Sequence, residues 1–222
     1  MAINLNFETV FAYWPQFLSG AGLTLRLSLL AMVVGLAIAI PCAWARVEGP
    51  AALRRAVRGY VEIIRNTPLL IQIYIVFFGL PGLGVRMSAD SAALVALSLN
   101  VGAYSTEIIR SGIQSINKGQ VEAAKALGLG ALQTFRFVVL RPALRNIYPA
   151  LTSQFIILML FSSLVSVIAA NDLSSVANHV QSVTFRSFEV YIVVTAIYFV
   201  LSSGLSGVFS LIFQRFIDYP TR

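Results

Sequence analysis

The sequence contains one cysteine and one histidine, and these two shortages exclude several kinds of site. Cys42 has no partner for a disulfide within the chain, and together with His179 it is too little for a Cys–His metal cluster. A Ser-His-Asp hydrolase would have to use His179 with Asp172, and the sequence contains no nucleophile-elbow motif. We predict that Asp172 and His179 lie in a solvated outer loop and that the chain is not an enzyme.

A phosphate-binding GxxxxGK[ST] loop is also absent, and charged residues make up only 11% of the chain. We therefore expect neither ATP nor any other cofactor to bind this chain. Hydrophobic residues make up 58%, and the mean hydropathy is +0.81. A soluble domain of 222 residues has no place to bury so much apolar surface, so the composition predicts a membrane protein in contact with lipid.

Five apolar segments are long enough to cross a bilayer, which takes about 20 residues of helix. We predict one all-α transmembrane domain, residues 1–222, with membrane-spanning helices at about 22–45, 60–80, 91–111, 147–170 and 189–213. Pro15 is expected to break any helix that precedes the first span, and Pro68 to kink or restart the second one.

The basic residues are sorted between alternate loops. The predicted outer segments hold two Lys or Arg residues, whereas the inner loops and the C-terminal tail hold thirteen. Because positive residues are retained on the cytosolic side, we predict that the N-terminus lies outside and the C-terminus in the cytosol. The net charge of +7 follows from this sorting, and because the basic residues do not gather with aromatic ones, no nucleic-acid partner is expected.

The segment between the third and fourth spans, residues 118–142, is basic and cannot lie in hydrocarbon, where a central Lys or Arg costs about 2.5–3.5 kcal/mol. Residues 120–127 are rich in strong helix formers, and Gly128 and Gly130 provide a stop. A short helix displayed in water between two spans is typical of a docking surface. An ordinary solvated loop is also compatible with these residues.

Several strings occur in a fixed order along the chain. EAA at 122–124 is followed by Gly128 and then by VVL at 138–140, and upstream lie YVEIIRNTPLL at 60–70 and LSLNVGAY at 97–104. The first set resembles the EAA loop of ABC-importer permease subunits. The two upstream strings are similar to the polar-amino-acid branch of that family, the histidine, glutamine and arginine type. The resemblance covers essentially the whole chain.

One position departs from this family pattern. The family usually has proline directly after the leucine at 140, whereas here Arg141 follows and Pro142 comes next. We expect the break in the helix to persist, shifted by one residue, because proline disfavours helical geometry in the residue before it.

The resemblance implies a subunit of a larger machine in the bacterial cytoplasmic (inner) membrane. Two permease subunits, this chain twice or with a paralogue, would form the pathway. A dimer of ABC ATPase subunits would bind ATP and Mg, and an external solute-binding protein, periplasmic or extracellular, would deliver a polar amino acid. The EAA loop would be a cytosolic coupling helix that fits a groove of the ATPase, with contacts from Glu122, Ala123, Ala124 and Gly128.

Polar side chains at membrane depth are candidates for the substrate pathway, because such residues normally face a cavity or the bundle interior. For each of them the alternative is an interhelical hydrogen bond, worth about 0.6 kcal/mol. Asn100 is the first choice, since it lies in mid-span and its amide can both donate and accept. The full set is Asn100, Gln72, Ser162 and Ser163, with Asn66 and Thr67 beside the helix-breaking Pro68.

Glu107 lies one helical turn from Arg110 and at a depth similar to that of Arg65, so we predict a structural ion pair rather than a proton relay. Every span then lacks an unpaired acid at mid-depth, and a strongly basic substrate would need its counter-charge from a partner subunit. A secondary transporter or channel would usually carry such mid-membrane charges, and a scaffold would need no polar lining. The motifs and the sorted charges favour the importer.

Overall fold

The computed structural model describes residues 5–130 and 133–218, and within them the chain is helical and contains no strand. The elements, with η marking short π or 3₁₀ segments, are α1 (Glu8–Phe11), α2 (Trp14–Glu48), α3 (Ala51–Arg65), α4 (Leu69–Tyr74), η1 (Ile75–Gly79), η2 (Leu80–Leu83), α5 (Ala89–Gln114), α6 (Lys118–Ala126), η3 (Thr134–Leu140), α8 (Arg141–Phe161), η4 (Ser162–Ile168), α9 (Leu173–Thr184), α10 (Ser187–Ile212) and η5 (Phe213–Ile217).

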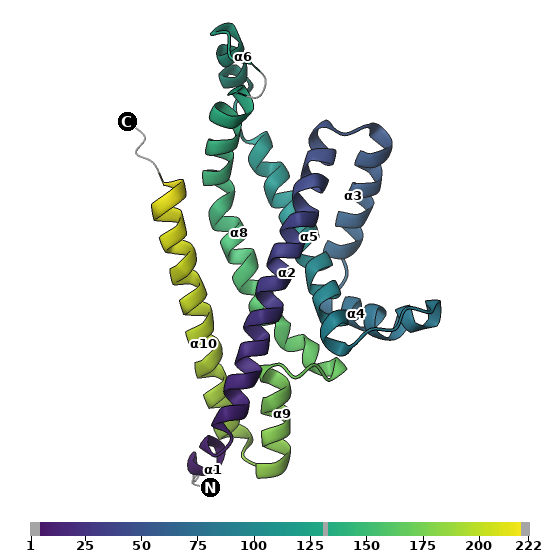
Figure 1. Ribbon diagram of the computed structural model, residues 1–222, viewed down its shortest axis with the longest axis vertical. Helices are drawn as coiled ribbons and strands as arrows, with labels where there is room; N and C mark the ends of the chain where they lie inside the picture. The colour runs from purple at the N-terminus through teal and green to yellow at the C-terminus, as the bar shows by residue number, and fades with distance from the viewer. Residues whose placement is uncertain (1–4, 131–132, 219–222) are drawn as a thin grey trace.

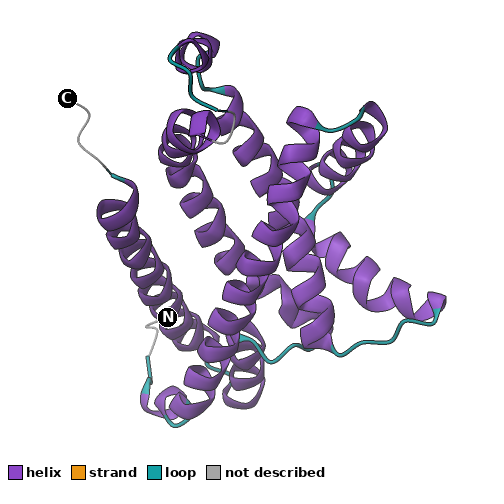
Figure 2. Cartoon of the chain, turned by 45° about the horizontal axis from the view of Figure 1, so that its top comes forward, coloured by secondary structure: helices purple, strands orange, loops and turns teal. Residues whose placement is uncertain are grey.

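The long helices α2, α5, α8 and α10 run roughly along the long axis of the molecule (Figure 1). Helix α6 lies at one end, together with the turn between α2 and α3 and the C-terminal end of α10. The N-terminal helix α1 and α9 lie at the opposite end. Helix α4 and the short segments after it project to the side (Figures 1 and 2).

Within the described part of the chain, four helical stretches are long and apolar enough to cross a membrane: Trp14–Glu48, Ala89–Gln114, Thr134–Ile168 and Ser187–Ile217. Helix α3 and the stretch Leu69–Leu83 meet the same criteria as a pair, but they are bent by 108° at the break between them. The predicted all-α membrane fold is therefore confirmed, with four spans, or five if the bent pair is one span.

The predicted second span, residues 60–80, is not a single rod. Helix α3 begins at Ala51, in the loop predicted to precede the span, and it ends at Arg65. Pro68 then adopts an extended conformation, with φ −61° and ψ 138°, and starts α4 as its N-terminal cap residue. Because proline has no N–H to donate and favours an extended residue before it, the helix restarts in a new direction.

Two other prolines have different outcomes. The predicted break at Pro15 is present: α1 ends at Phe11, and α2 begins at Trp14 with Pro15 in its first turn, where a missing N–H costs nothing, although this start is earlier than the predicted residue 22. Pro142 causes no break, contrary to the prediction, because η3 and α8 form one continuous stretch, Thr134–Ile168. The turn before Pro142 is a π-helix, which is the kind of local adjustment that accommodates an irregular residue inside a helix.

The core of the bundle is a close approach of α2 and α5. A Cβ atom on Gly35 would lie 2.2 Å from Val101 Cγ1 and 3.2 Å from the backbone N of Gly102. A Cβ on Gly102 would lie 2.9 Å from the hydroxyl of Tyr60, which donates a hydrogen bond of 2.7 Å to the carbonyl of Leu99. Glycine at both positions thus lets two backbones meet and lets α3 lie against them, as small residues do at membrane helix contacts.

Helix α9 replaces the solvated outer loop that we predicted around Asp172 and His179. Asp172 is fully buried as the N-cap of α9, and its carboxylate accepts hydrogen bonds of 3.0 Å from the backbone N–H groups of Ser174 and Ser175. His179 is exposed, as predicted. The prediction is wrong for Asp172 because the helix packs against α2, where the hydroxyl of Thr24 accepts from the residue after Asp172 at 3.2 Å.

The Gly35 contact gives the first prediction. Gly35→Val places a branched side chain against two backbones and should lower the melting temperature of the purified protein by an amount equivalent to about 1–3 kcal/mol. Gly22→Val is the matched control on the same helix, because a Cβ at Gly22 meets no atom within 4 Å. Equal melting temperatures for the two variants would contradict the assigned contact.

Asp172 gives a pH prediction. Burial raises the pKa of its carboxyl to about 6 from an ordinary 3.8, so the folded protein holds a proton over a range where the unfolded chain has lost it. The contribution of Asp172 to stability therefore falls as the pH rises from about 4 to about 6, and it is constant above that. Asp172→Asn keeps a capping oxygen and removes the titration.

We expect the melting temperature of Asp172→Asn, relative to that of the wild type, to be higher near pH 7.5 than near pH 4.5, by roughly the equivalent of 1–3 kcal/mol. Thermal unfolding in detergent at the two pH values measures this difference. The same offset at both pH values would show that the carboxyl does not titrate between them.

Candidate functional site: a polar cleft at a broken helix and an exposed terminal helix

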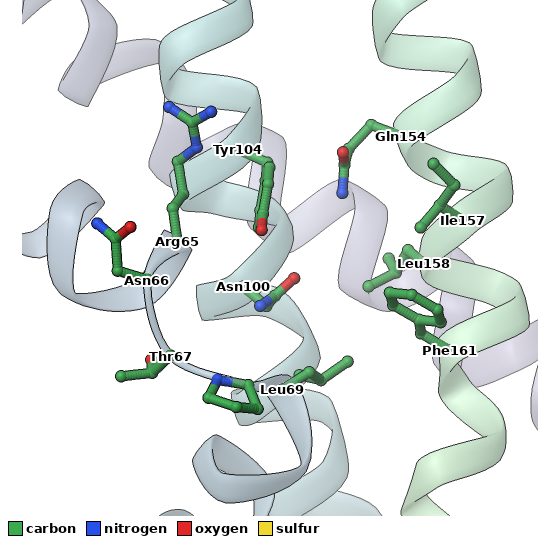
Figure 3. A pocket seen from close by; sticks show the side chains of 11 residues that line it. Arg65, Asn66, Thr67, Leu69, Asn100, Tyr104, Gln154, Ile157, Leu158 and Phe161 are labelled. Atoms are coloured by element: carbon green, nitrogen blue, oxygen red, sulfur yellow. The ribbon is translucent and has the colours of Figure 1, made fainter.

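A cleft of about 580 Å³ lies where the break between α3 and α4 faces α5 and α8 (Figure 3). It combines polar groups from the break and α5 with a largely apolar wall from α8. The residues that line it are Arg65, Asn66, Thr67, Pro68, Leu69, Asn100, Tyr104, Gln154, Ile157, Leu158 and Phe161. A concave site with a few convergent polar groups in an apolar setting is the usual form of a small-molecule site.

Three of the predicted pathway residues, Asn66, Thr67 and Asn100, line this cleft. Gln72 lies behind Asn100, only 7% exposed, and it contacts the cleft through that residue. Gln154, Tyr104 and Arg65 were not predicted. Gln154 could have been predicted, because it is the one amide in the apolar run of the predicted fourth span. Tyr104 and Arg65 could not, because they reach the cleft only through the bend between α3 and α4.

Ser162 and Ser163 do not line the cleft. Ser162 is fully buried and donates to the carbonyl of Met159 at 2.7 Å, and Ser163 donates to the carbonyl of Leu160 at 2.8 Å. Both hydroxyls therefore satisfy carbonyls of their own helix end. Ser163 also borders a second cleft, of about 350 Å³, between α8 and α10.

The break is held together by side-chain amides. The Nε2 group of Gln72 donates to the carbonyl of Ile64 at 2.8 Å, to the carbonyl of Thr67 at 2.9 Å and to the hydroxyl of Thr67 at 3.1 Å. The Nδ2 group of Asn100 donates to Gln72 Oε1 at 3.0 Å. The carbonyls freed where the helix stops thus find donors inside the protein, which irregular backbone at membrane depth requires.

The charge inside the cleft is positive. The Arg65 guanidinium stacks on the ring of Tyr104, 5.2 Å from its centroid, and no acidic side chain is among the lining residues. Glu107 is paired with Arg110, as predicted, and also lies 3.8 Å from Arg46 on α2, which the sequence did not suggest. Arg65, predicted at a depth similar to that of Glu107, is near enough to interact with that carboxylate electrostatically and also stacks on Tyr104 at the cleft.

Helix α6 is short and well terminated. Its N-cap Asn117 accepts from the N–H of Gly119 at 2.8 Å. At its other end Gly128 has φ +79°, and hydrogen bonds from Leu129 N to Ala124 O and from Gly128 N to Lys125 O form a Schellman termination. The stop predicted at Gly128 is therefore present.

The predicted coupling residues divide into two groups. Glu122, Ala123 and Gly128 are exposed, and Leu127 beside them is 81% exposed, whereas Ala124 is buried. Helix α6 is packed against η3, so Ala124 belongs to the internal side of the helix. Residues 131 and 132 of the predicted loop lie outside the described residues. Within residues 5–130 and 133–218, no three His, Cys, Asp or Glu side chains gather as a metal site.

Comparisons with known proteins agree with this arrangement. Residues 35–218 match the family model described as binding-protein-dependent transport system inner membrane component. The chain is 36% identical to the arginine transport system permease protein ArtQ of Bacillus subtilis (strain 168), over 90% of this chain and 91% of that protein. It is also 36% identical to the probable glutamine ABC transporter permease protein GlnM of the same organism, over 91% and 94%.

A solved structure described as an amino acid ABC transporter with histidines matches 96% of this chain and 100% of its own, with a TM-score of 0.88 and 38% identity. The inward-facing MetNI methionine ABC transporter matches 91% of this chain and 97% of its own, with a TM-score of 0.75. At 21% identity, the second likeness concerns the fold alone.

Proposed function

The chain belongs to the family of binding-protein-dependent transport system inner membrane components, and from this membership we propose that it forms the membrane pathway of an ATP-driven importer of polar amino acids. It is a multi-pass membrane protein and a permease subunit of an ABC transporter, not an enzyme. The observation that carries the proposal is the pairing of a polar cleft at a broken helix with an exposed, capped helix at one end of the same molecule.

In this proposal α6 faces the cytosol. The end of the molecule that bears α6 also carries the turn between α2 and α3 and the C-terminal end of α10, where most of the basic residues lie. The opposite end, with α1 and α9, holds few basic residues. Positive residues are retained on the inner side of a membrane, so this asymmetry supports an outer N-terminus and an inner C-terminus.

The partners in this proposal follow from the family. A dimer of ABC ATPase subunits supplies the site for ATP and Mg. A second permease subunit, identical or paralogous, completes the pathway in the bacterial inner membrane. A solute-binding protein outside the cell delivers the substrate to the end that carries α9.

We assign coupling to α6. Its exposed face offers Glu122 as a charge for a basic partner, Ala123 as a site of close approach and Leu127 as an apolar contact. The ATPase would pull this helix when it closes on ATP. The movement would pass along the continuous stretch Thr134–Ile168, which reaches the cleft through Gln154 and Phe161.

Gly128→Val tests this assignment. Valine at φ +79° costs at least about 1–2 kcal/mol, so the variant should distort the end of α6 without affecting the spans. We expect normal membrane insertion and assembly, with uptake per ATP hydrolysed in proteoliposomes lowered about tenfold or more, because a strained α6 transmits the movement poorly. Glu122→Lys should act in the same direction through the charge of the contact.

Gly130→Val is the control, since Gly130 does not have a positive φ and a Cβ there makes only an ordinary contact, 3.7 Å from Gln133 Oε1. It should transport like the wild type. Wild-type coupling in Gly128→Val and Glu122→Lys would show that α6 is an ordinary loop helix.

We assign the cleft to the substrate pathway. Arg65 supplies a positive group for the carboxylate that every amino acid carries, and Asn100 and Asn66 supply amides. The cleft has no acid to balance a cationic side chain, and an unpaired buried charge costs several kcal/mol. The substrate in this proposal is thus a neutral or acidic polar amino acid.

A transporter with two copies of this chain should therefore take up L-glutamine at least about tenfold faster than L-arginine or L-lysine at equal occupancy of the binding protein. Proteoliposome uptake measures the rates, and the affinity of the isolated binding protein for each amino acid sets the occupancy. Selective uptake of arginine or lysine would overturn the assigned charge preference.

A further inference from the structure

Gln72 and Asn100 form a chain of two side-chain amides whose direction is fixed at one end. The Nε2 group of Gln72 lies 2.8 Å and 2.9 Å from two backbone carbonyl oxygens, those of Ile64 and Thr67. A carbonyl oxygen can only accept, so this end of the Gln72 side chain must be its donor. Its Oε1 is therefore the atom that faces Asn100.

The orientation of Asn100 follows from that of Gln72. Because Gln72 presents an oxygen, Asn100 must direct its Nδ2 group to it, and the distance between these atoms is 3.0 Å. The Oδ1 atom of Asn100 then points away from Gln72. Figure 3 shows this oxygen on the side of Asn100 that faces α8 across the cleft, where Gln154 and Leu158 lie.

We infer that Gln72 is a positioning residue that fixes Asn100 as a hydrogen-bond acceptor toward the substrate. Both side chains are more than nine-tenths buried, at 7% and 6% exposed, so water does not compete for these bonds. Without Gln72, Asn100 could rotate and present its NH₂ group instead. The inference rests on the proposed function of the cleft as the substrate pathway.

The fixed acceptor matches one chemical group. An amino acid carries an α-ammonium, which can only donate, and an α-carboxylate, which can only accept. Arg65 in the same cleft is a donor that suits the carboxylate, and Asn100 Oδ1 is an acceptor that suits the ammonium. Arg65 and Asn100 thus select a zwitterion in one orientation. The bend between α3 and α4 makes this possible, because it places both Arg65 and Gln72 near Asn100.

The test uses the difference between an amide and a carboxylate. In Gln72→Met the two carbonyls lose their donor, and Asn100 loses the acceptor that orients its amide. Uptake, measured with a saturating concentration of substrate-loaded binding protein, should therefore fall about tenfold, the equivalent of one hydrogen bond to a charged group. Adding Asn100→Asp should restore uptake to within about threefold of the wild type, because a carboxylate can accept through either oxygen and does not have to be oriented by Gln72.

The probe is the tritiated L-amino acid that the wild-type transporter takes up fastest from a set that includes L-glutamine. A merely structural role for Gln72 would not be rescued at Asn100, so a double variant no better than Gln72→Met overturns the inference. Ser98→Ala is the control: Ser98 is buried on the same helix as Asn100 but does not line the cleft, and its hydroxyl has no hydrogen-bond partner within the described residues, so the variant should transport normally.

Gln72→Lys keeps the test decisive if Gln72→Met does not assemble. Lysine still donates to the carbonyls of the break, at the cost of a buried charge, but it offers no acceptor to Asn100 Nδ2, so uptake per assembled transporter should fall. Normal uptake by this variant also overturns the inference. Asn100→Leu distinguishes failure of the proposed function from failure of the positioning role. Full uptake by Asn100→Leu refutes the cleft as the substrate pathway. Loss of uptake in Asn100→Leu together with normal uptake in Gln72→Met refutes only the positioning role of Gln72.

Discussion

The backbone contact between α2 and α5 is the constraint on which the rest of the structure depends. Gly35 and Gly102 let the two helices touch without side chains between them, and the hydroxyl of Tyr60 reaches over Gly102 to the carbonyl of Leu99. Helix α3 is thereby fixed against α5 at the height of Asn100, the residue next to Leu99. The break after α3 consequently meets the one deep amide of α5, and the cleft forms where they meet.

The cleft and α6 lie far apart in the fold, and one stretch of helix joins them. From η3, which packs against α6, the chain continues as helix to Ile168 without interruption. Its middle part supplies Gln154, Ile157 and Phe161 to the cleft wall. The opposite wall comes from α5 and the break, which the glycine contact holds to α2. One wall is thus part of a helical stretch that extends to the end of the molecule that carries α6, and the other belongs to the packed centre of the bundle.

Much of this arrangement could be predicted from the sequence, because local chemistry decides it. Apolar runs specify the long helices, Pro68 specifies the break, and Gly128 specifies the end of α6. The side-chain network could not be predicted, since Gln72 and Asn100 are 28 positions apart and meet only through the 108° bend. Asp172 was placed in water for a similar reason: its burial depends on how α9 packs on α2.

The length of α2 has a consequence for depth. Its 35 residues span about 52 Å, whereas the hydrocarbon of a bilayer is about 30 Å thick, so roughly 20 Å of it stands in the headgroups and water. If this surplus is shared by both ends, the turn into α3 lies about 10 Å above one hydrocarbon boundary. Helix α3, 15 residues and about 22 Å long, then descends through that boundary and ends about 12 Å beneath it. The arginines of α3 near the turn therefore stay hydrated. The bend between α3 and α4 lies close to the midplane of the bilayer, where a solute is equally far from both aqueous phases.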